Sequence, residues 1–435
     1  MILADYPVTT LSSIDGAAFG GVVISPDSYR AYQITVPVFV QVDGLGDLWP
    51  IPEAAGPDQS WVSVIHPDNT VTTLPPIRGT LASHIVISPD ATRAYYTSEV
   101  VDAVNHSTHV SVIDLEKTLT TLPPIEGSPA SGVVVCPDGT RAYQTTEIET
   151  ASGVHQTSVS LIHADNTITT LPPIEGSPLG GGVVVSPDGT RAYQTTDTGS
   201  GVYQTSVSLI HADNTITTLP PIEGRPLDAL VVSPDGTRAY LTIETFDFDT
   251  DRWPTPTGTS VLVIEPDNVV TTLPLDGDAT GGVVVSPDCM RAYQTIQTAT
   301  ETLVLVISPD NTFTTLSLDG DATGGVVVSP DGDQVFQTTA LLDSVTDHYS
   351  GTLVSVISAD NTVTTLPPIA GRPPYEPPGR TFSTEWQAGV VISPDGTHAY
   401  QSTVTDTKTP IGGWTITGTL VSVISIAATS NRQKS

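Results

Sequence analysis

Short segments rich in Val, Ile and Thr recur along the whole chain, and each is bounded by Pro, Asp, Asn or Gly. β-Branched residues favour strands, whereas the bounding residues favour turns. No long segment shows the 3.6-residue period of an amphipathic helix. The pattern therefore predicts an all-β protein built from short strands and tight turns.

Two strand–turn–strand units alternate. The first reads GVVVSPDGTRAYQTT at 182–196, and the second reads TSVSLIHADNTITTLPPI at 157–174. Pro fixes φ, Asp bonds nearby amides and Gly accepts positive φ, so SPDG and ADNT are turns. The Val-Val-Val run is apolar on both faces, as expected of an innermost strand between neighbouring sheets. Each pair of units therefore predicts four antiparallel strands.

The number of copies predicts the architecture. The Pro of the first unit occurs in eight copies, at Pro26, Pro89, Pro137, Pro187, Pro234, Pro287, Pro330 and Pro394. The second unit has seven full copies and one split copy, because 7–14 match its second half and 418–426 its first half. A linear solenoid has no reason to split a repeat, whereas a ring is closed when the N-terminal strand completes the last blade.

We therefore predict a single domain, a closed eight-bladed β-propeller with four antiparallel strands per blade. The expected blades are 19–77, 81–125, 130–174, 180–222, 228–275, 280–318, 323–369, and 387–426 plus 6–14.

The units resemble YVTN-type β-propeller repeats of bacterial and archaeal surface proteins. The matching run is Ser186-Pro187-Asp188-Gly189-Thr190-Arg191-Ala192-Tyr193, followed by a V-S-V-I type strand, and the likeness extends from about Tyr6 to Ile426. The chain differs in reading Tyr-Gln-Thr-Thr where Tyr-Val-Thr-Asn is common, and many relatives look seven-bladed. The segments 156–176 and 204–224 are identical, which favours a scaffold over a catalytic constellation.

Charge narrows the possible partners. The formal net charge is −32, with only 15 Lys and Arg, which disfavours nucleic acid and anionic membrane surfaces. No apolar run is long enough for a membrane span. The first residues lack signal-peptide features, which leaves a cytoplasmic protein or one whose signal has been removed. The resemblance implies an extracellular or cell-surface location, and we expect a monomer.

Several polar residues belong to the repeat itself. We expect the Arg at one repeat position, such as Arg191, to pair with turn aspartates such as Asp188. His66, His163 and His211 share another position, which does not let them converge on one metal ion. Cys136 and Cys289 replace Ser and Gly and lie three blades apart, so we expect no disulfide between them.

Functional residues are expected where the repeat breaks. The links between second and third strands, and between blades, vary in length and lie at one end of the blades, which we call the top end. Aromatic rings there suit stacking on a sugar or gripping a peptide, although they could instead be buried within their own loops. The candidate binding residues are Trp49, Trp61, Tyr375, Phe382, Trp386 and Trp414, expected at the seam of the last and first blades, and Trp253.

The inner strands offer a second candidate site. Most begin with Gly pairs, but two carry the ionisable residues His84 and Asp228. These would serve a lactonase-like or lyase alternative. A zinc site using His84 with His106, His109 and His155 is a further alternative.

An acidic segment also offers a candidate cation-binding site. Asp247, Asp249 and Asp251 match the first positions of an EF-hand calcium loop. The positions at which that loop requires Gly and Glu are occupied by Trp253 and Gly258. A looser calcium site remains an alternative, and otherwise no cofactor is expected.

No motif of a common catalytic site is present, including G-x-S-x-G, H-E-x-x-H and the P-loop. We therefore predict a non-catalytic binding or scaffold propeller that recognises a glycan or protein through its top-end loops. A lactonase-like hydrolase or lyase, and a purely structural module of a larger surface protein, are the alternatives.

Overall fold

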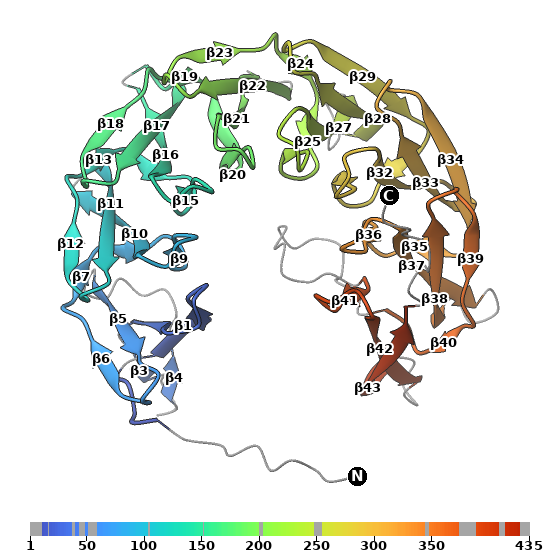
Figure 1. Ribbon diagram of the computed structural model, residues 1–435, viewed down its shortest axis with the longest axis horizontal. Helices are drawn as coiled ribbons and strands as arrows, with labels where there is room; N and C mark the ends of the chain where they lie inside the picture. Colours follow the sequence, from blue (N-terminus) through green and yellow to red (C-terminus); the bar gives the residue numbers. More distant parts are fainter. Residues whose placement is uncertain are drawn as a thin grey trace, which may run out of the picture. The chain divides into compact units, whose positions relative to one another are not determined.

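The structure is a computed structural model (Figure 1) that describes residues 11–15, 17–36, 40–42, 48–50, 59–102, 105–150, 152–199, 203–247, 255–343, 348–373, 389–408 and 414–426. These residues form antiparallel strands and contain no helix. None of the described segments is therefore a helix that could cross a membrane. The chain divides into two compact units, 1–199 with 206–221 and 200–205 with 222–435, which are described separately.

The first unit contains four sheets and a two-stranded ribbon. The first sheet consists of β1 (Ala17–Ile24), β2 (Ala31–Val36), β5 (Gln59–Ile65), β6 (Val71–Thr73) and β7 (Ile77–Arg78), and the ribbon of β3 (Val40–Val42) and β4 (Leu48–Pro50). The second consists of β8 (Thr80–Leu81), β9 (Val86–Ile87), β10 (Arg93–Asp102), β11 (Asn105–Asp114), β12 (Leu119–Thr121) and β13 (Ile125–Glu126). The third consists of β14 (Ser128–Pro129), β15 (Val134–Val135), β16 (Arg141–Glu149), β17 (His155–His163), β18 (Ile168–Thr170) and β19 (Ile174–Glu175). The fourth consists of β20 (Ser177–Val185), β21 (Arg191–Asp197), β22 (Gln204–His211) and β23 (Ile216–Thr218).

The second unit begins with the short β24 (Ile222–Glu223), which pairs with Gln204 and Thr205. Its first sheet consists of β25 (Arg225–Pro226), β26 (Val231–Val232), β27 (Ala239–Asp247), β28 (Thr255–Ile264) and β29 (Val270–Leu275). The next consists of β30 (Asp278–Ala279), β31 (Val284–Val285), β32 (Ala292–Gln297), β33 (Thr302–Ile307) and β34 (Phe313–Leu318). Then come β35 (Asp321–Ala322), β36 (Val327–Val328), β37 (Gln334–Asp343), β38 (His348–Ser358), β39 (Val363–Thr365) and β40 (Ile369–Ala370). The last sheet consists of β41 (Val391–Ile392), β42 (His398–Lys408) and β43 (Trp414–Ser425).

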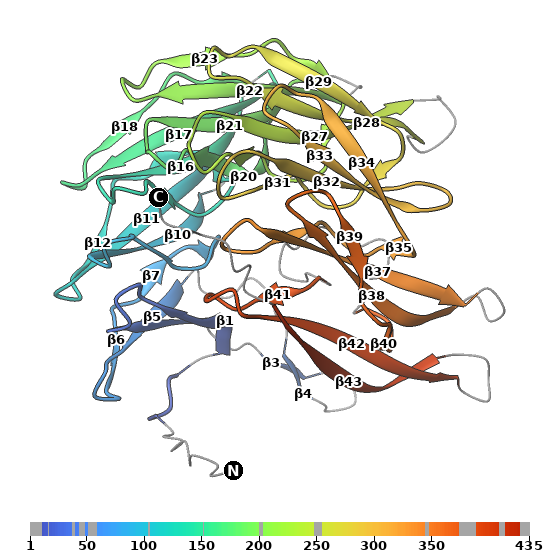
Figure 2. The same ribbon diagram turned by 45° about the vertical axis from the view of Figure 1, so that its right-hand side comes forward.

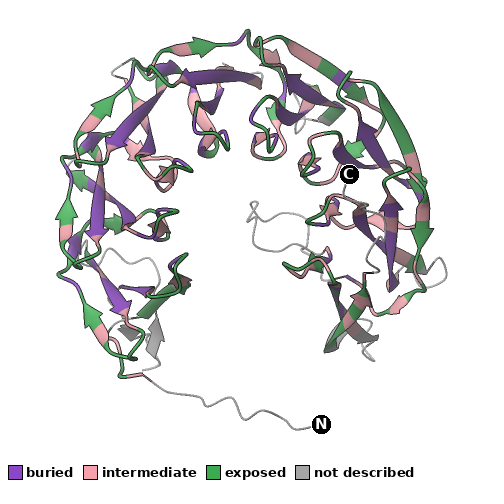
Figure 3. Ribbon diagram, viewed as in Figure 1, coloured by how far each residue is buried: buried purple, intermediate pink, exposed green. Residues whose placement is uncertain are grey.

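Within each unit the strands of a sheet lie side by side in chain order (Figures 1 and 2), and neighbouring sheets pack on one another through apolar clusters. Tyr95 and Val112 of the second sheet, for example, pack with Val133 and Ile162 of the third. The middle strands are mostly buried, while the fourth strands are largely exposed (Figure 3). Such repeated, face-packed meanders are the blade architecture of β-propellers, which confirms the predicted all-β, propeller-type fold.

The last sheet shows three described strands. The predicted fourth strand, 6–14, lies mostly outside the described residues, and its described part, 11–14, is not in a strand. Eight blades closed into a ring therefore stay a prediction.

Each SPDG turn is held by its own side chains. Ser186 Oγ donates to Asp188 Oδ1 at 2.6 Å, and the Thr190 amide donates to the same oxygen at 3.0 Å. The Arg191 amide in turn donates to Ser186 Oγ at 3.0 Å. The Ser186 hydrogen bond, followed by the Thr190 amide and hydroxyl, outweighs partial burial and lowers the pKa of Asp188. The turn aspartates are therefore structural, as expected.

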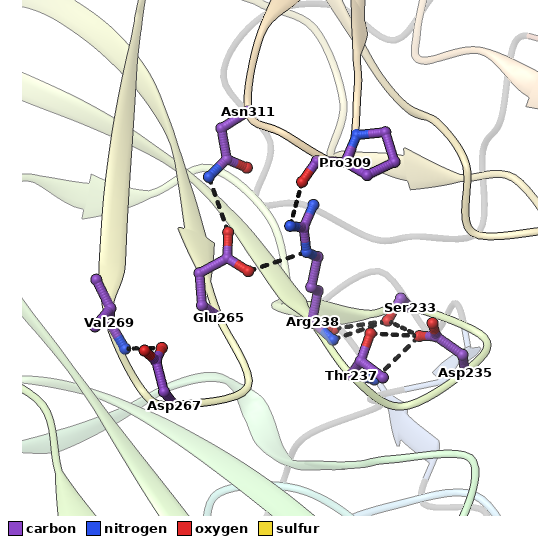
Figure 4. A network of polar contacts seen from close by, with 9 residues as sticks. All are labelled: Ser233, Asp235, Thr237, Arg238, Glu265, Asp267, Val269, Pro309 and Asn311. Carbon is purple, nitrogen blue, oxygen red and sulfur yellow. Dashed lines mark hydrogen bonds and ion pairs between the residues drawn. The ribbon is translucent and has the colours of Figure 1, made fainter.

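Four of the repeat arginines hydrogen-bond to the following sheet and not to the turn aspartates predicted as their partners, although Arg141 and Arg291 still help to lower the pKa of Asp138 and Asp288. Arg93, Arg141, Arg238 and Arg291 donate to backbone carbonyls of the following sheet, those of Ala164, Gly189, Pro309 and Ala359 respectively. The turn aspartates are already engaged by Ser and Thr, which leaves the guanidinium groups to join neighbouring sheets. Arg238 adds an ion pair with Glu265 at 3.0 Å (Figure 4), and Asn311 donates to the same carboxylate at 2.8 Å.

The Gln and Thr of Tyr-Gln-Thr-Thr also join neighbouring sheets. Thr145 Oγ1 donates to Gln194 Oε1 at 3.0 Å, and Gln194 Nε2 donates to the Thr195 carbonyl at 3.0 Å. The same Thr-to-Gln bond recurs from Thr97 to Gln144, Thr242 to Gln294, Thr295 to Gln337 and Thr338 to Gln401. All these side chains are buried, so the departure from Tyr-Val-Thr-Asn places a polar bond between sheets.

Candidate functional site

The predicted aromatic patch falls largely outside the described residues. Tyr375, Phe382 and Trp386 lie in 374–388, and Trp253 lies in 248–254, both of which are outside them. Trp49 belongs to β4 and Trp414 begins β43, but their side chains are not described. The patch at the seam therefore stays a prediction.

Trp61 is the one predicted tryptophan whose side chain is described. It is half-buried on β5, where its Cα pairs with that of Thr35 on β2. Beside it, Ser60 Oγ lies 2.5 Å from Tyr96 Oη of the next sheet. Burial, only partly offset by this Ser60 hydrogen bond, raises the pKa of Tyr96 to about 12. Trp61 thus lies on a strand of the first sheet, and its neighbour Ser60 is held by a buried hydrogen bond to the next sheet.

His84 and Asp228 are both exposed, and each lies between the two short segments of an inner strand. The His84 ring centroid lies 5.7 Å from that of Phe19. The Asp228 carboxylate accepts a hydrogen bond from the Ala229 amide at 2.7 Å. They belong to different units, so each is described only with its own neighbours.

Close packing accounts for two of the glycines at the other inner strands, Gly182 and Gly282. A Cβ on Gly182 would lie 2.3 Å from Ser131 Oγ of the preceding sheet. A Cβ on Gly282 would likewise lie 2.9 Å from Asp228 Oδ2. A larger residue at either position would displace the Ser131 or Asp228 side chain of the preceding sheet, and Gly182 also has a positive φ of 121°.

The histidines of the zinc alternative have separate partners. His106 Nδ1 lies 2.7 Å from Glu99 Oε1, and His155 Nδ1 lies 3.0 Å from Glu147 Oε1. His109 lies 3.3 Å from Ser107 Oγ, and its pKa is lowered, first by burial and then by Arg78. The described residues hold no group of three or more His, Cys, Asp or Glu side chains arranged to hold a metal ion.

The three repeat histidines also have individual partners. His66, His163 and His211 hydrogen-bond to Thr72, Thr169 and Thr217 of the adjoining fourth strand, at 3.0, 2.9 and 2.9 Å. This contact ties the fourth strand to the third and gives these histidines a structural role.

The acidic loop is only partly described. Asp247 is exposed at the end of β27, opposite Thr255, whereas Asp249 and Asp251 lie outside the described residues. A calcium site there stays an alternative.

The structure reveals top-end residues that sequence reasoning missed. Tyr203 and Phe246 form an edge-to-face pair with ring centroids 5.2 Å apart. The Arg225 guanidinium lies 5.8 Å from the Tyr203 ring centroid. Glu244 is half-buried, and burial, reinforced by Asp278 and opposed by Arg225, raises its pKa. A signal was present, because Tyr203 stands at the repeat position of His106 and His155.

No protein-family model and no curated protein matches the sequence. Among solved structures, the chain is similar to a eukaryotic initiation factor, with 11% identity, 91% of this chain and 84% of that chain covered, and a TM-score of 0.56. That likeness shows a shared fold alone.

Two weaker similarities are to hydrazine synthase of Kuenenia stuttgartiensis and to a proposed 6-phosphogluconolactonase of Bacteroides fragilis. The first has 18% identity, covers 81% of this chain and 100% of that chain, and has a TM-score of 0.42. The second has 17% identity, covers 73% and 92%, and has a TM-score of 0.37. Neither similarity carries a functional argument.

Proposed function

We propose that this chain is a non-catalytic binding protein whose top end recognises a glycan or a protein. The observation that carries the proposal is the contrast between the two ends of the sheets. At the bottom end, the end of the SPDG and ADNT turns, the same Ser–Asp and Thr–Asp hydrogen bonds recur from sheet to sheet. At the top end the connection from the second to the third strand varies in length. It is short at 298–301 and long between β2 and β5. Variable loops on a rigid scaffold are typical of binding sites.

Charge supports the same ligand classes. With a net charge of −32, the protein repels nucleic acids and other polyanions, whereas neutral glycans and neutral or basic peptides meet no such barrier. The proposal includes the eight-bladed ring closed by 6–14 that the split repeat favours, a cell-surface or extracellular location, and a monomeric state.

The test is a titration with soluble cell-surface glycans and with peptides, followed by Trp fluorescence. Trp386→Ala and Trp414→Ala are the variants, and thermal melting verifies that they fold. A saturable signal that both variants weaken supports binding at the predicted aromatic patch. A folded wild-type protein that binds nothing contradicts the proposal and favours the structural-module alternative.

The hydrolase alternative rests on His84 and Asp228, which are both exposed at inner turns. Proton transfer needs groups within hydrogen-bond reach of a substrate. Hydrolysis of a δ-lactone that either His84→Ala or Asp228→Asn abolishes would support this alternative. Hydrolysis no faster than in buffer would exclude it for that substrate class.

A further inference from the structure

A cluster at the top end of the second unit departs from the repeat. It consists of Tyr203, Arg225, Glu244 and Phe246, with Asp278 from the next sheet, and we call it the Tyr203 cluster. The equivalents of Arg225 in the preceding repeats are Thr80, Ser128 and Ser177, each of which pairs with the acidic residue of its second strand. The substitution therefore introduces a guanidinium group where the repeat has a hydroxyl.

The backbone holds this cluster firmly. Arg225 is directly paired with Glu244 across β25 and β27. The Gly224 amide donates to the Tyr203 carbonyl at 2.9 Å, and Thr205 Oγ1 donates to the Gly224 carbonyl at 2.7 Å. The turn that carries Arg225 is thereby fixed to the strand that begins beside Tyr203.

The repeat provides matched copies of Glu244. Glu99 and Glu147 occupy its position, and each has a histidine partner on the following strand, at 2.7 and 3.0 Å. Asp197, at the same position, accepts the Gly199 amide at 2.9 Å. In these copies the carboxylate is engaged by its own sheet.

Glu244 has lost that partner. The histidine position is Thr257, whose hydroxyl donates to Thr245 Oγ1 at 3.1 Å instead. Within the part of the chain that the structure describes, the Glu244 carboxylate has no hydrogen bond and no ion pair. A half-buried carboxylate that accepts no hydrogen bond from its own sheet can accept one from a ligand.

We propose that the Tyr203 cluster binds a neutral saccharide, an inference that rests on the proposed glycan-binding function. Glu244 and Asp278 accept hydrogen bonds from sugar hydroxyls, and Arg225 donates to sugar oxygens. The rings of Tyr203 and Phe246 offer an apolar surface to the C–H face of the sugar. Two carboxylates against one guanidinium disfavour an anionic sugar, and a small cation is the competing occupant.

The experiment is calorimetric titration of the full chain with the methyl glycosides of mannose, galactose and N-acetylglucosamine. Glu244→Gln keeps the shape of the side chain but removes its charge, and Arg225→Ala removes the donor. Glu147→Gln is the matched control, because that carboxylate already has His155 as a partner. We expect at least one glycoside to bind, with affinity at least about tenfold weaker in each cluster variant, because each variant removes a hydrogen bond that involves a charged group. The affinity should be unchanged in Glu147→Gln.

Three results would overturn the inference. Binding that survives Glu244→Gln and Arg225→Ala but is lost in Trp386→Ala would place the sugar elsewhere and leave the proposed function standing. Binding of putrescine or Ca²⁺ in place of the glycosides, lost in Glu244→Gln, would make the cluster a cation site. If no glycoside binds the wild-type protein, the saccharide site is wrong, and the peptide titration alone then decides the proposed function.

Discussion

Some side chains make the same structural contact in several repeats, whereas others occur in only one copy. The buried Thr145–Gln194 hydrogen bond and its four equivalents engage polar side chains in joining sheets, so these side chains are not available to a ligand. The sequence shows that Gln and Thr recur, but their partners lie about one repeat away, so only packing reveals them. The same holds for the arginines, whose acceptors are carbonyls of the following sheet.

The Thr145–Gln194 bond can be measured by a double-mutant cycle. Thr145→Val and Gln194→Leu should each lower the free energy of unfolding by about 1–3 kcal/mol, because each leaves a buried polar partner without its hydrogen bond. The double variant should lose less than the sum of the two, because it removes both groups. Urea unfolding followed by circular dichroism measures all four proteins. Strictly additive losses would contradict a direct bond.

Acid should destabilise the turns. The Ser393 hydroxyl, followed by the Thr397 amide, holds the pKa of Asp395 at about 2. Since this pKa lies below the usual value of about 3.9 for an unfolded chain, the stabilisation is present above pH 4 and is lost as the pH falls toward 2. Between pH 7 and the sequence pI of about 4.2, a falling pH reduces the net negative charge. The weaker charge repulsion raises the stability in that range, opposite to the effect of protonating the turn aspartates.

Melting temperatures measured between pH 7 and pH 2 should therefore fall steeply only below about pH 4. Asp395→Asn should make that fall shallower. A melting temperature that is constant or rising from pH 4 to pH 2 would contradict structural roles for the turn aspartates.

At the scale of the element, tight turns were the most predictable feature, because their chemistry is local. The SPDG glycines adopt positive φ, for example 69° at Gly189, and the ADNT asparagines do so as well, for example 67° at Asn166. The fourth strands are short and end at Pro-Pro in several repeats, which protects their exposed edges from pairing with another chain. Predicting the top-end cluster was harder, because Tyr203 and Arg225 are single changes within a nearly identical repeat.

Cys289 offers a test of turn strain. It occupies the glycine position of its turn with a φ of 60°, a left-handed conformation that costs a non-glycine residue about 1 kcal/mol. Cys289→Gly should therefore raise the free energy of unfolding by up to about 1 kcal/mol. Cys289→Ala keeps the strain and removes the 3.3 Å contact of Sγ with the Asp235 amide, so it should not stabilise. Equal stability of both variants would contradict the strain.

The turn before each inner strand provides a second test. Gly127 has a φ of 96°, and a Cβ there would lie 2.4 Å from the Glu147 carbonyl oxygen. Gly153 also has positive φ, 75°, but a Cβ there would meet nothing within 4 Å. Gly127→Ala should cost several kcal/mol, against about 1 kcal/mol for Gly153→Ala. Similar losses in thermal melting would contradict the close approach.

At the scale of the whole molecule, the repeat predicts where function does not lie. The bottom-end turns carry the same hydrogen bonds from sheet to sheet, whereas partners and loop lengths differ at the top end. The all-β, blade-type architecture could be predicted from the sequence because every repeat contributes the same evidence. The ligand could not, since recognition depends on the few positions at which the copies differ.

Hydroxyl-radical footprinting tests the central claim most directly. The glycan or peptide that binds in the fluorescence titration is added, and the loss of side-chain oxidation is mapped along the chain. We predict protection of Tyr203 and Phe246 for a ligand of the Tyr203 cluster, or of Trp61 for a ligand of the predicted aromatic patch. In both cases the oxidation of the exposed bottom-end residues Tyr29, Met290 and Phe313 stays unchanged. Protection of Tyr29, Met290 and Phe313, with the top-end aromatics unchanged, would contradict binding through the non-repeating end.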